Sequence, residues 1–229
     1  VDIYPELKAE ARIKVPEMRR AVENKCHNII RLEIMNKFGY YVTESSEHSA
    51  EYMPYWIKKT YPELIQEFNI PLDEYPRRCI DNIKRWKEQY AELTADTVLT
   101  HDISVEYGSS IMEGIETGVP FSFGGNVLND NFITNLPSEA VVEIPCIADA
   151  NGIRGDFHGR LPTQCAALNM TNINPQLLTI EAAMTRKKET VYQAAMLDPH
   201  TAAELSIDDI IKLCDALFEA HGTMIPEYK

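Results

Sequence analysis

The segment EAVVEIPCIAD, residues 139–149, decides the fold class of this chain. Apolar residues are nearly continuous along it, and a short apolar run between turn residues is typical of a buried strand. The preceding segment VPFSFGGNVLND (119–130) combines alternation with two glycines and polar turn residues, which predicts a strand followed by a turn. The following segment, NGIRGDFHGRLP (151–162), is predicted to be a glycine-rich loop.

Helices are predicted on both sides of these strands. One long helix is expected over residues 16–38, because Pro16 suits a first helical turn and Gly39 suits a stop. Ser206 and Asp209 form a capping box ahead of the last apolar stripe. The other expected helices span residues 61–68, 76–94, 104–118, 163–170, 174–197 and 206–221. Since no repeat, low-complexity tract or flexible linker separates these elements, the sequence predicts one mostly helical α+β domain over residues 1–229.

Composition excludes several classes of function. The net charge of −13 over 229 residues argues against a nucleic-acid-binding protein, which needs a basic face. No apolar run approaches the roughly 20 residues that span a bilayer, so no membrane partner is expected. The five cysteines are odd in number and form no CxxC pair, which indicates reduced thiols and a cytoplasmic protein.

The segment GYYVTESSEHSAEY, residues 39–52, concentrates acidic, basic and hydroxyl groups. Its apolar residues recur at neither helical nor strand spacing, so it is predicted to be a loop. Glu44 and Glu47 suggest a carboxylate acid/base pair, although acidic residues three apart in a loop are usually only solvated. The serine pair beside His48 suggests, more weakly, a nucleophile and its base.

Tyr40 and Tyr41 suggest a different chemistry. A tyrosine with the ordinary pKa of about 10 is a poor base at neutral pH. Beside a divalent metal and a positively charged cofactor its phenolate is favoured, and it can then remove a carbon-bound proton. The alternative is that the two tyrosines fill core space at a helix end. The six histidines form no HxH or HxxxH pair, so the sequence predicts no metal ligand within this chain.

Four motifs, in order along the chain, resemble the family 4 glycoside hydrolases. FGYYVTESSEHSAEYMPYW (38–56) resembles the F-G-Y-aromatic-V-T-E-S-S-x-H-x-S-E-Y-x-P motif of that family, most closely in its α-galactosidase (melibiase) and α-glucosidase branch. Residues 104–149 are similar to the family's E-Y-G…G-N-V-x-N…N-L-P…V-V-E-x-P segment. GRLPTQCAAL (159–168) and AMLDPHTAAELS (195–206) are similar too, so the resemblance covers essentially the whole chain.

The resemblance implies a C-terminal half. Family members begin with a Rossmann-type NAD-binding domain, followed by a cysteine and a histidine that bind a divalent metal, usually manganese. Neither part is in this sequence, and VDIYPEL (1–7) resembles the segment soon after the metal-binding histidine. The implied fold is a substrate domain of the lactate/malate dehydrogenase-like plan, with a small mixed or antiparallel sheet and no N-terminal Rossmann domain. NAD and Mn²⁺ would be bound mainly by the missing half.

The resemblance also implies a reaction, which is an NAD-dependent exception to two-carboxylate glycoside hydrolysis. NAD⁺ takes hydride from C3 of the sugar, and a tyrosine removes the acidified C2 proton while the metal stabilises the enediolate. Elimination, water addition and return of the hydride complete the hydrolysis. The resemblance places the family's base tyrosine in the segment GYY, so the base corresponds to Tyr41 or Tyr40. Glu44, His48 and Glu51 become candidates to bind sugar hydroxyls or to orient the base.

Several substrates and partners are compatible with the resemblance. The TESSEH pattern favours an unphosphorylated hexoside, and an α-galactoside is the first choice. A 6-phospho-glycosidase would need basic side chains for the dianionic phosphate, and Arg154 and Arg160 keep that alternative open. An α-glucosidase and a uronic-acid glycosidase are also compatible. The implied partners are the protein's own N-terminal NAD-binding domain, a small sugar and further copies in a homo-oligomer.

Two rival interpretations belong to other classes. In one, this polypeptide is a sugar-binding or oligomerisation module without turnover, and the isolated chain is expected to be inactive. In the other, it is the substrate domain of a lactate/malate-type dehydrogenase, which would call for a catalytic histidine and a substrate-binding arginine instead of a tyrosine-rich loop. Removal of a partner domain is expected to expose an apolar docking face.

Overall fold

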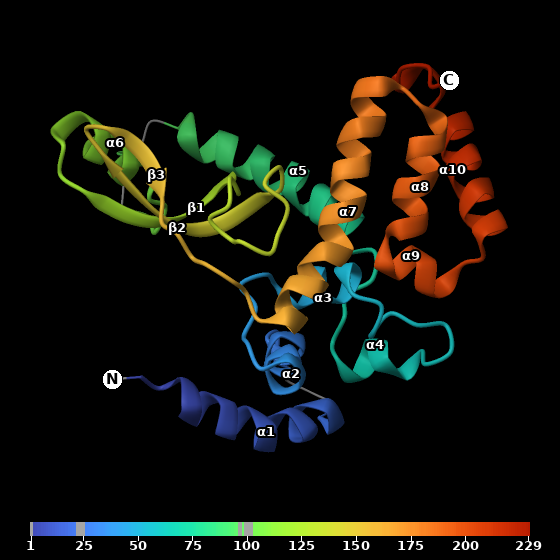
Figure 1. Cartoon of the computed structure of the whole chain (residues 1–229), viewed down its shortest axis with the longest axis horizontal. Helices are drawn as coiled ribbons and strands as arrows, with labels where there is room; N and C mark the ends of the chain where they lie inside the picture. Colours follow the sequence, from blue (N-terminus) through green and yellow to red (C-terminus); the bar gives the residue numbers. More distant parts are fainter. Residues whose placement is uncertain (1, 22–25, 96–97, 99–102) are drawn as a thin grey trace. The chain divides into compact units, whose positions relative to one another are not determined.

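The computed structural model describes residues 2–21, 26–95, 98 and 103–229. The chain divides into two compact units, coloured along the sequence in Figure 1. The first consists of residues 1–70, 128–141 and 157–229, and the second of residues 71–127 and 142–156. One domain over residues 1–229 stays a prediction, because a chain that passes back and forth between two units is compatible with one domain or two.

Four helices form the N-terminal part of the first unit. They are α1 (Tyr4–Arg20), α2 (Ile29–Phe38), α3 (Ser46–Tyr52) and α4 (Glu63–Glu67). The centre of this part is α2, whose Ile29, Ile30 and Ile34 are almost inaccessible to solvent. The other buried members of the cluster are Ala50, Trp56, Phe68 and Ile70. Burial of this set anchors the segment between α2 and α3, which carries the candidate site.

The single helix predicted over residues 16–38 is wrong. Pro16 lies inside α1 instead of at its start, and Pro5 occupies the first turn. α1 ends where Ala21 adopts an extended backbone with ψ 136°. Residues 22–25 lie outside the described residues, and α2 follows. The apolar stripe therefore belongs to two helices. Pro5, and not Pro16, occupies the first-turn position that favours a proline.

The C-terminal part of the first unit is a group of four helices. They are α7 (Thr163–Thr185), α8 (Lys188–Leu197), α9 (Pro199–Glu204) and α10 (Ile207–His221), and α8 packs against α7 and α10. The predicted break between residues 170 and 174 is wrong, because α7 runs through Pro175. The break falls at Arg186, whose left-handed φ of 60° ends α7. The predicted cap at Ser206 is confirmed, since its Oγ accepts the Asp209 N–H at 3.2 Å.

The second unit contains a three-stranded sheet and two helices. β1 (Phe121–Leu128), β2 (Val141–Asp149) and β3 (Gly152–Gly155) lie in the order β1-β2-β3, and β2 pairs with β3 antiparallel in the register Cys146↔Gly155. The strands predicted in 119–130 and 139–149 are confirmed, and so is the mostly helical α+β class with a small antiparallel sheet. The predicted loop over 151–162 is wrong at its start, because β3 folds back on β2 there.

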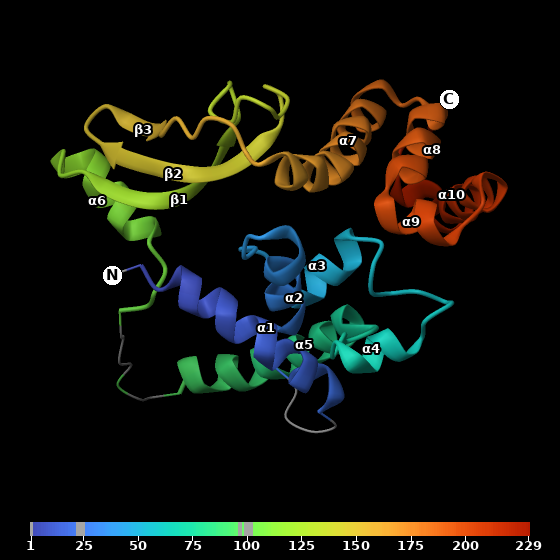
Figure 2. The ribbon, with the colours of Figure 1, turned by 60° about the horizontal axis from the view of Figure 1, so that its bottom comes forward.

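The helices of the second unit are α5 (Glu74–Leu93) and α6 (Gly108–Thr117). Figures 1 and 2 show α6 against one face of the sheet. A Cβ on Gly114 of α6 would stand 2.9 Å from the backbone oxygen of Ala148 in β2. Glycine at this position therefore allows a close approach of helix to strand. By contrast, α5 contains no buried residue.

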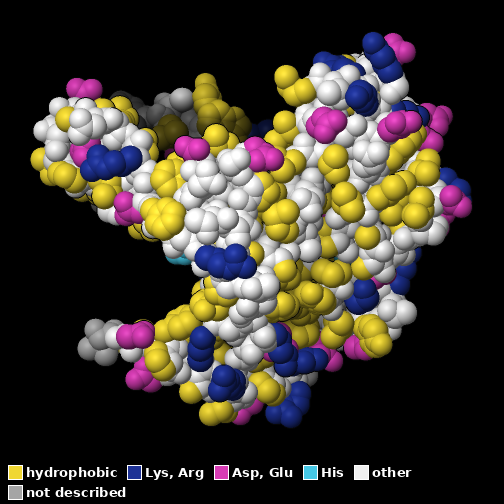
Figure 3. Space-filling model, in the orientation of Figure 1, with side chains coloured by type: hydrophobic (Ala, Val, Ile, Leu, Met, Phe, Trp, Pro, Cys, Tyr) yellow, Lys and Arg dark blue, Asp and Glu magenta, His cyan; other side chains and the backbone are white. Residues whose placement is uncertain are grey.

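One face of the molecule carries a mixture of side-chain types. Over the face shown in Figure 3, Lys and Arg side chains are interspersed with Asp and Glu and with hydrophobic side chains. None of the described helices combines the length and the hydropathy that crossing a membrane requires.

Candidate functional site

The segment that carries the candidate tyrosines begins where α2 ends. Gly39 adopts a left-handed φ of 89°, and its N–H donates to the Met35 carbonyl at 2.9 Å. A glycine takes this conformation without strain, which makes it a common helix stop. The chain then leaves the helix and presents Tyr40 and Tyr41 directly after the buried helix end.

Residues 46–52, predicted as part of a loop, form the helix α3 instead. Ser45 is its N-cap, with Oγ accepting the His48 N–H at 3.2 Å. The buried face of α3 consists of Ser46, Ser49 and Ala50, which recur at helical spacing but are small or polar. An apolar pattern therefore cannot reveal this helix. The arrangement does not favour a serine nucleophile, because Ser45 Oγ caps the helix and Ser46 Oγ is buried.

Tyr41 is held at both its backbone and its ring. Its N–H donates to the Tyr4 hydroxyl on α1 at 2.7 Å. The guanidinium of Arg31, on α2, lies over its ring with Cζ 4.4 Å from the centroid. Tyr40 is more loosely placed: 47% of its surface is exposed, and the Lys8 ammonium lies 5.3 Å from its ring centroid. The structure thus distinguishes the two tyrosines, which the sequence does not.

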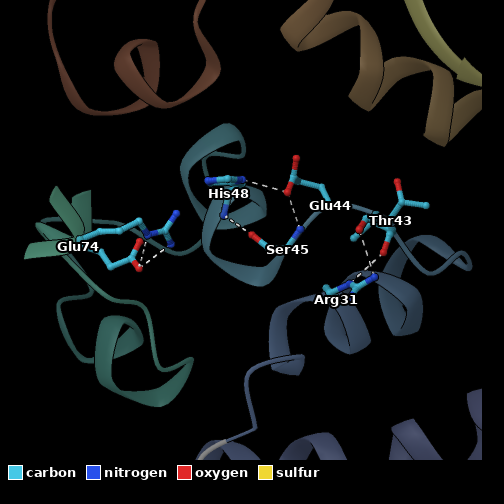
Figure 4. A network of polar contacts seen from close by, with 8 residues as sticks. Arg31, Thr43, Glu44, Ser45, His48 and Glu74 are labelled. Atoms are coloured by element: carbon cyan, nitrogen blue, oxygen red, sulfur yellow. Dashed lines mark hydrogen bonds and ion pairs between the residues drawn. The ribbon is translucent and has the colours of Figure 1, made fainter. Parts of the chain in front are cut away.

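Arg31 also binds the backbone of the two residues that follow Tyr41. Its Nε donates to the Val42 carbonyl at 3.0 Å, and its Nη2 donates to the Thr43 carbonyl at 3.2 Å. Figure 4 shows the side chain reaching from α2 to this segment. The planar guanidinium can serve two acceptors in fixed directions, which a lysine cannot do. Sequence reasoning missed Arg31, because nothing in its helix signals a contact with residues eleven and twelve positions further on.

Glu44 and His48 form the polar centre of the segment (Figure 4). Glu44 Oε1 lies 3.0 Å from His48 Nδ1 and accepts the Ser45 N–H at 2.7 Å. The Ser45 N–H, and to a lesser extent His48, hold the pKa of Glu44 below its ordinary value. With Nδ1–H donating to the carboxylate, the neutral ring presents Nε2 as an acceptor. Half of each side chain is exposed, so the pair can meet the hydroxyls of a ligand.

Glu51 and Arg160 lie outside this network. Glu51 is exposed on α3, and Arg160 is exposed in the segment that joins Gly159 to Leu161. Within the described part of the chain, no hydrogen bond or ion pair joins either residue to the Glu44–His48 pair. Arg154, the second basic candidate for a phosphate, forms an ion pair with Asp149 at 2.6 Å in the second unit.

The described residues do not contain a set of side chains that could bind a metal ion. They contain no group of three or more histidine, cysteine, aspartate or glutamate side chains placed to hold an ion. Mn²⁺ therefore does not fit the residues that the structure describes.

Comparison with known proteins assigns the family. Residues 1–201 match the model of the family 4 glycosyl hydrolase C-terminal domain. The chain is 60% identical over 228 residues to an alpha-galactosidase of Bacillus subtilis, covering 100% of this chain and 51% of that protein. The fold is similar to that of lplD from Bacillus subtilis, with a TM-score of 0.81 at 18% identity over 95% of this chain and 50% of the other.

A second solved structure extends the comparison. The 6-phospho-alpha-glucosidase from gut microorganisms, in complex with NAD and Mn²⁺, superposes with a TM-score of 0.70 at 19% identity, covering 100% of this chain and 52% of that one. At such low identity the likeness concerns the fold alone. The chain spans about half the length of the relatives that it matches. Taken with the four motifs and the site geometry, the match along most of its length means that this chain belongs to the family 4 glycosyl hydrolases.

Proposed function

We propose that this chain is the substrate-side part of an α-galactosidase, in which Tyr41 accepts a proton from C2 of the sugar. The observation that carries the proposal is the double fixation of Tyr41, by Tyr4 at its N–H and by Arg31 at its ring and the following carbonyls. A proton acceptor must be held within reach of the bond that it attacks, so rigid placement favours Tyr41 over the more exposed Tyr40.

The chemistry divides between this chain and groups bound outside its described residues. NAD⁺, when bound there, would supply the oxidation at C3, and a divalent metal would polarise the resulting carbonyl, so that the C2 proton becomes acidic. The segment 40–48 supplies the proton acceptor and the hydrogen-bonding groups. The Glu44 carboxylate accepts from a sugar hydroxyl, and His48 Nε2 accepts from a second one, while their mutual contact fixes both orientations. The acid for the leaving group is assigned to another part of the protein.

The choice of an unphosphorylated α-galactoside is supported by two observations. The relative with 60% identity over the whole chain is an alpha-galactosidase. Of the two arginines that keep the 6-phosphate alternative open, Arg154 and Arg160, the first is already paired with Asp149. A cytoplasmic location, an NAD-binding domain as partner and a homo-oligomer remain parts of the proposal.

The test uses the natural polypeptide that contains this chain, with NAD⁺, Mn²⁺ and a reductant, and nitrophenyl α-galactoside as substrate. Tyr41→Phe should lower kcat by roughly 10²–10⁴-fold, the usual contribution of a positioned acid or base. Tyr40→Phe is the matched control, since it removes a neighbouring hydroxyl of the same kind, and it should change kcat far less.

Isotope effects separate proton transfer from a loss of structure. With substrate deuterated at C2, the residual activity of Tyr41→Phe should show a larger primary isotope effect than the wild type. Turnover that does not change when NAD⁺ is removed would refute the proposed reaction. A Tyr41→Phe variant with wild-type kcat would refute the assignment of the base.

A further inference from the structure

The amide side chain of Gln164 joins α7 to the start of the candidate site. Gln164 lies in the first turn of α7, and its Nε2 donates to the carbonyl oxygen of Phe38 at 3.0 Å. Phe38 is the last residue of α2, directly before Gly39, where the chain turns into the segment that carries the two tyrosines. Figure 1 shows the first turn of α7 close to the end of α2. The bond therefore links two segments that are 126 residues apart, one of which leads into the site.

This bond completes the C-terminal end of α2. The last four carbonyl groups of a helix have no partner within the helix, and a side chain from elsewhere can supply the missing donor. Gly39 already donates its N–H to the Met35 carbonyl. Among the described residues, the Gln164 amide is the donor that reaches the Phe38 carbonyl. The helix end from which the two tyrosines extend is therefore fixed from α7.

α7 also contacts the other end of the segment. Asn172 lies about two turns further along α7, and its Nδ2 donates to the Tyr52 carbonyl at 3.4 Å. Tyr52 is the last residue of α3. Residues 39–51 therefore lie between two helix ends that both accept a hydrogen bond from α7.

An ion pair holds the C-terminal helices beside this segment. Lys58 Nζ lies 2.9 Å from Glu204 Oε1 on α9, and both side chains are largely buried. The Lys59 N–H donates to Glu204 Oε2 at 3.2 Å. The bond from Lys58, followed by the Lys59 N–H, lowers the pKa of Glu204 below its ordinary value. Because α8 packs against both α7 and α9, this anchor also restrains α7, so the bond from Gln164 is not an isolated surface contact.

We propose that Gln164 is a positioning residue of the reaction, which holds the end of α2 so that Tyr41 stands where it can accept the C2 proton. The inference rests on the proposed function and adds to it a group from α7. Gln164 acts through the backbone of Phe38 and Gly39. Proton transfer is sensitive to such support, because a displacement of about 1 Å can cost roughly 100-fold in rate.

The test uses the natural polypeptide that contains residues 1–229, with NAD⁺, Mn²⁺, a reductant and nitrophenyl α-galactoside. Gln164→Met keeps the length of the side chain but removes its donor. It should lower kcat by about 10-fold and leave KM within about 2-fold, because Glu44 and His48 keep their own contact. Gln164→Lys keeps an N–H donor of similar reach and should recover most of the lost rate.

Gln176→Met is the matched control. It makes the same substitution at an exposed position of the same helix, where the described residues give the side chain no hydrogen bond. Both kcat and KM should therefore keep their wild-type values in Gln176→Met.

Two further measurements separate positioning from a loss of folded protein. With substrate deuterated at C2, Gln164→Met should show a larger primary isotope effect than the wild type, because proton transfer is the step that slows. Unfolding of part of the protein would leave the isotope effect unchanged. The Tyr41 N–H, which donates to the Tyr4 hydroxyl, should exchange with solvent about 5-fold faster in Gln164→Met and at the wild-type rate in Gln176→Met.

Three results would overturn the proposal. Gln164→Met could keep the wild-type kcat and the wild-type exchange of the Tyr41 N–H. It could lose kcat without any change in the isotope effect. Gln176→Met could lose as much kcat as Gln164→Met does. Failure of the proposed function has a different signature, because it appears as a wild-type kcat in Tyr41→Phe.

Discussion

Replacement of Arg31 tests how firmly the structure holds the segment that carries Tyr41. Arg31→Met keeps the aliphatic stem but removes the two donors and the charge. The half-buried bond from Nε to the Val42 carbonyl should contribute about 1.5 kcal/mol, the low end for a charged donor. The exposed bond to the Thr43 carbonyl and the contact with the Tyr41 ring should each add about 0.5 kcal/mol. The segment should therefore open more easily by about 2.5 kcal/mol.

Amide hydrogen exchange measures this opening directly. The Tyr41 N–H is protected by its bond to the Tyr4 hydroxyl, so it exchanges only when the segment moves. A change of about 2.5 kcal/mol corresponds to a roughly 70-fold faster exchange of this amide in Arg31→Met. The exchange rate of the Tyr41 amide in Arg31→Lys should lie between those of Arg31→Met and the wild type, because lysine keeps the charge but cannot donate to both carbonyls.

A matched control separates this effect from a general loss of charge. Arg85→Met removes an exposed arginine from α5 and should leave the exchange of Tyr41 unchanged. Wild-type exchange of the Tyr41 amide in Arg31→Met would refute the reasoning, since it would mean that the guanidinium does not restrain the segment in solution.

Two further predictions concern the pH dependence of stability and the packing of the second unit. Since the N–H of the following serine, and then His48, lower the pKa of Glu44, this group stabilises the fold above the ordinary glutamate pKa of 4.5, and the effect is lost as the pH falls through the lowered folded-state pKa. The difference in unfolding free energy between wild type and Glu44→Gln should shrink on acidification below pH 4.5, and a difference that stays constant in urea titrations would contradict the assignment. Gly114→Ala should cost roughly 1–3 kcal/mol of unfolding free energy, because its Cβ would stand 2.9 Å from the Ala148 backbone oxygen. Gly108→Ala on the same helix meets nothing within 4 Å, so equal denaturation midpoints for the two variants would count against the packing of α6 on the sheet.

Local chemistry determined much of this protein from the sequence alone. The apolar run at 139–149 predicts a buried strand from local sequence alone, and β2 forms there. Gly39 and Ser206 cap their helices through contacts with the backbone of the same helix ends. The four ordered motifs identify the family without a structure. Glu44 and His48 stand out in the sequence as candidates, because they lie in one short segment rich in hydrogen-bonding groups.

The tertiary structure decided what depends on distant contacts. α3 buries Ser46, Ser49 and Ala50, which carry little apolar signal, so its packing against α2 adds to the Ser45 cap in making this segment a helix. Arg31 reaches Tyr41 across a helix end, and this contact distinguishes Tyr41 from Tyr40. Such contacts join residues that are far apart in sequence, and short-range patterns carry no record of them.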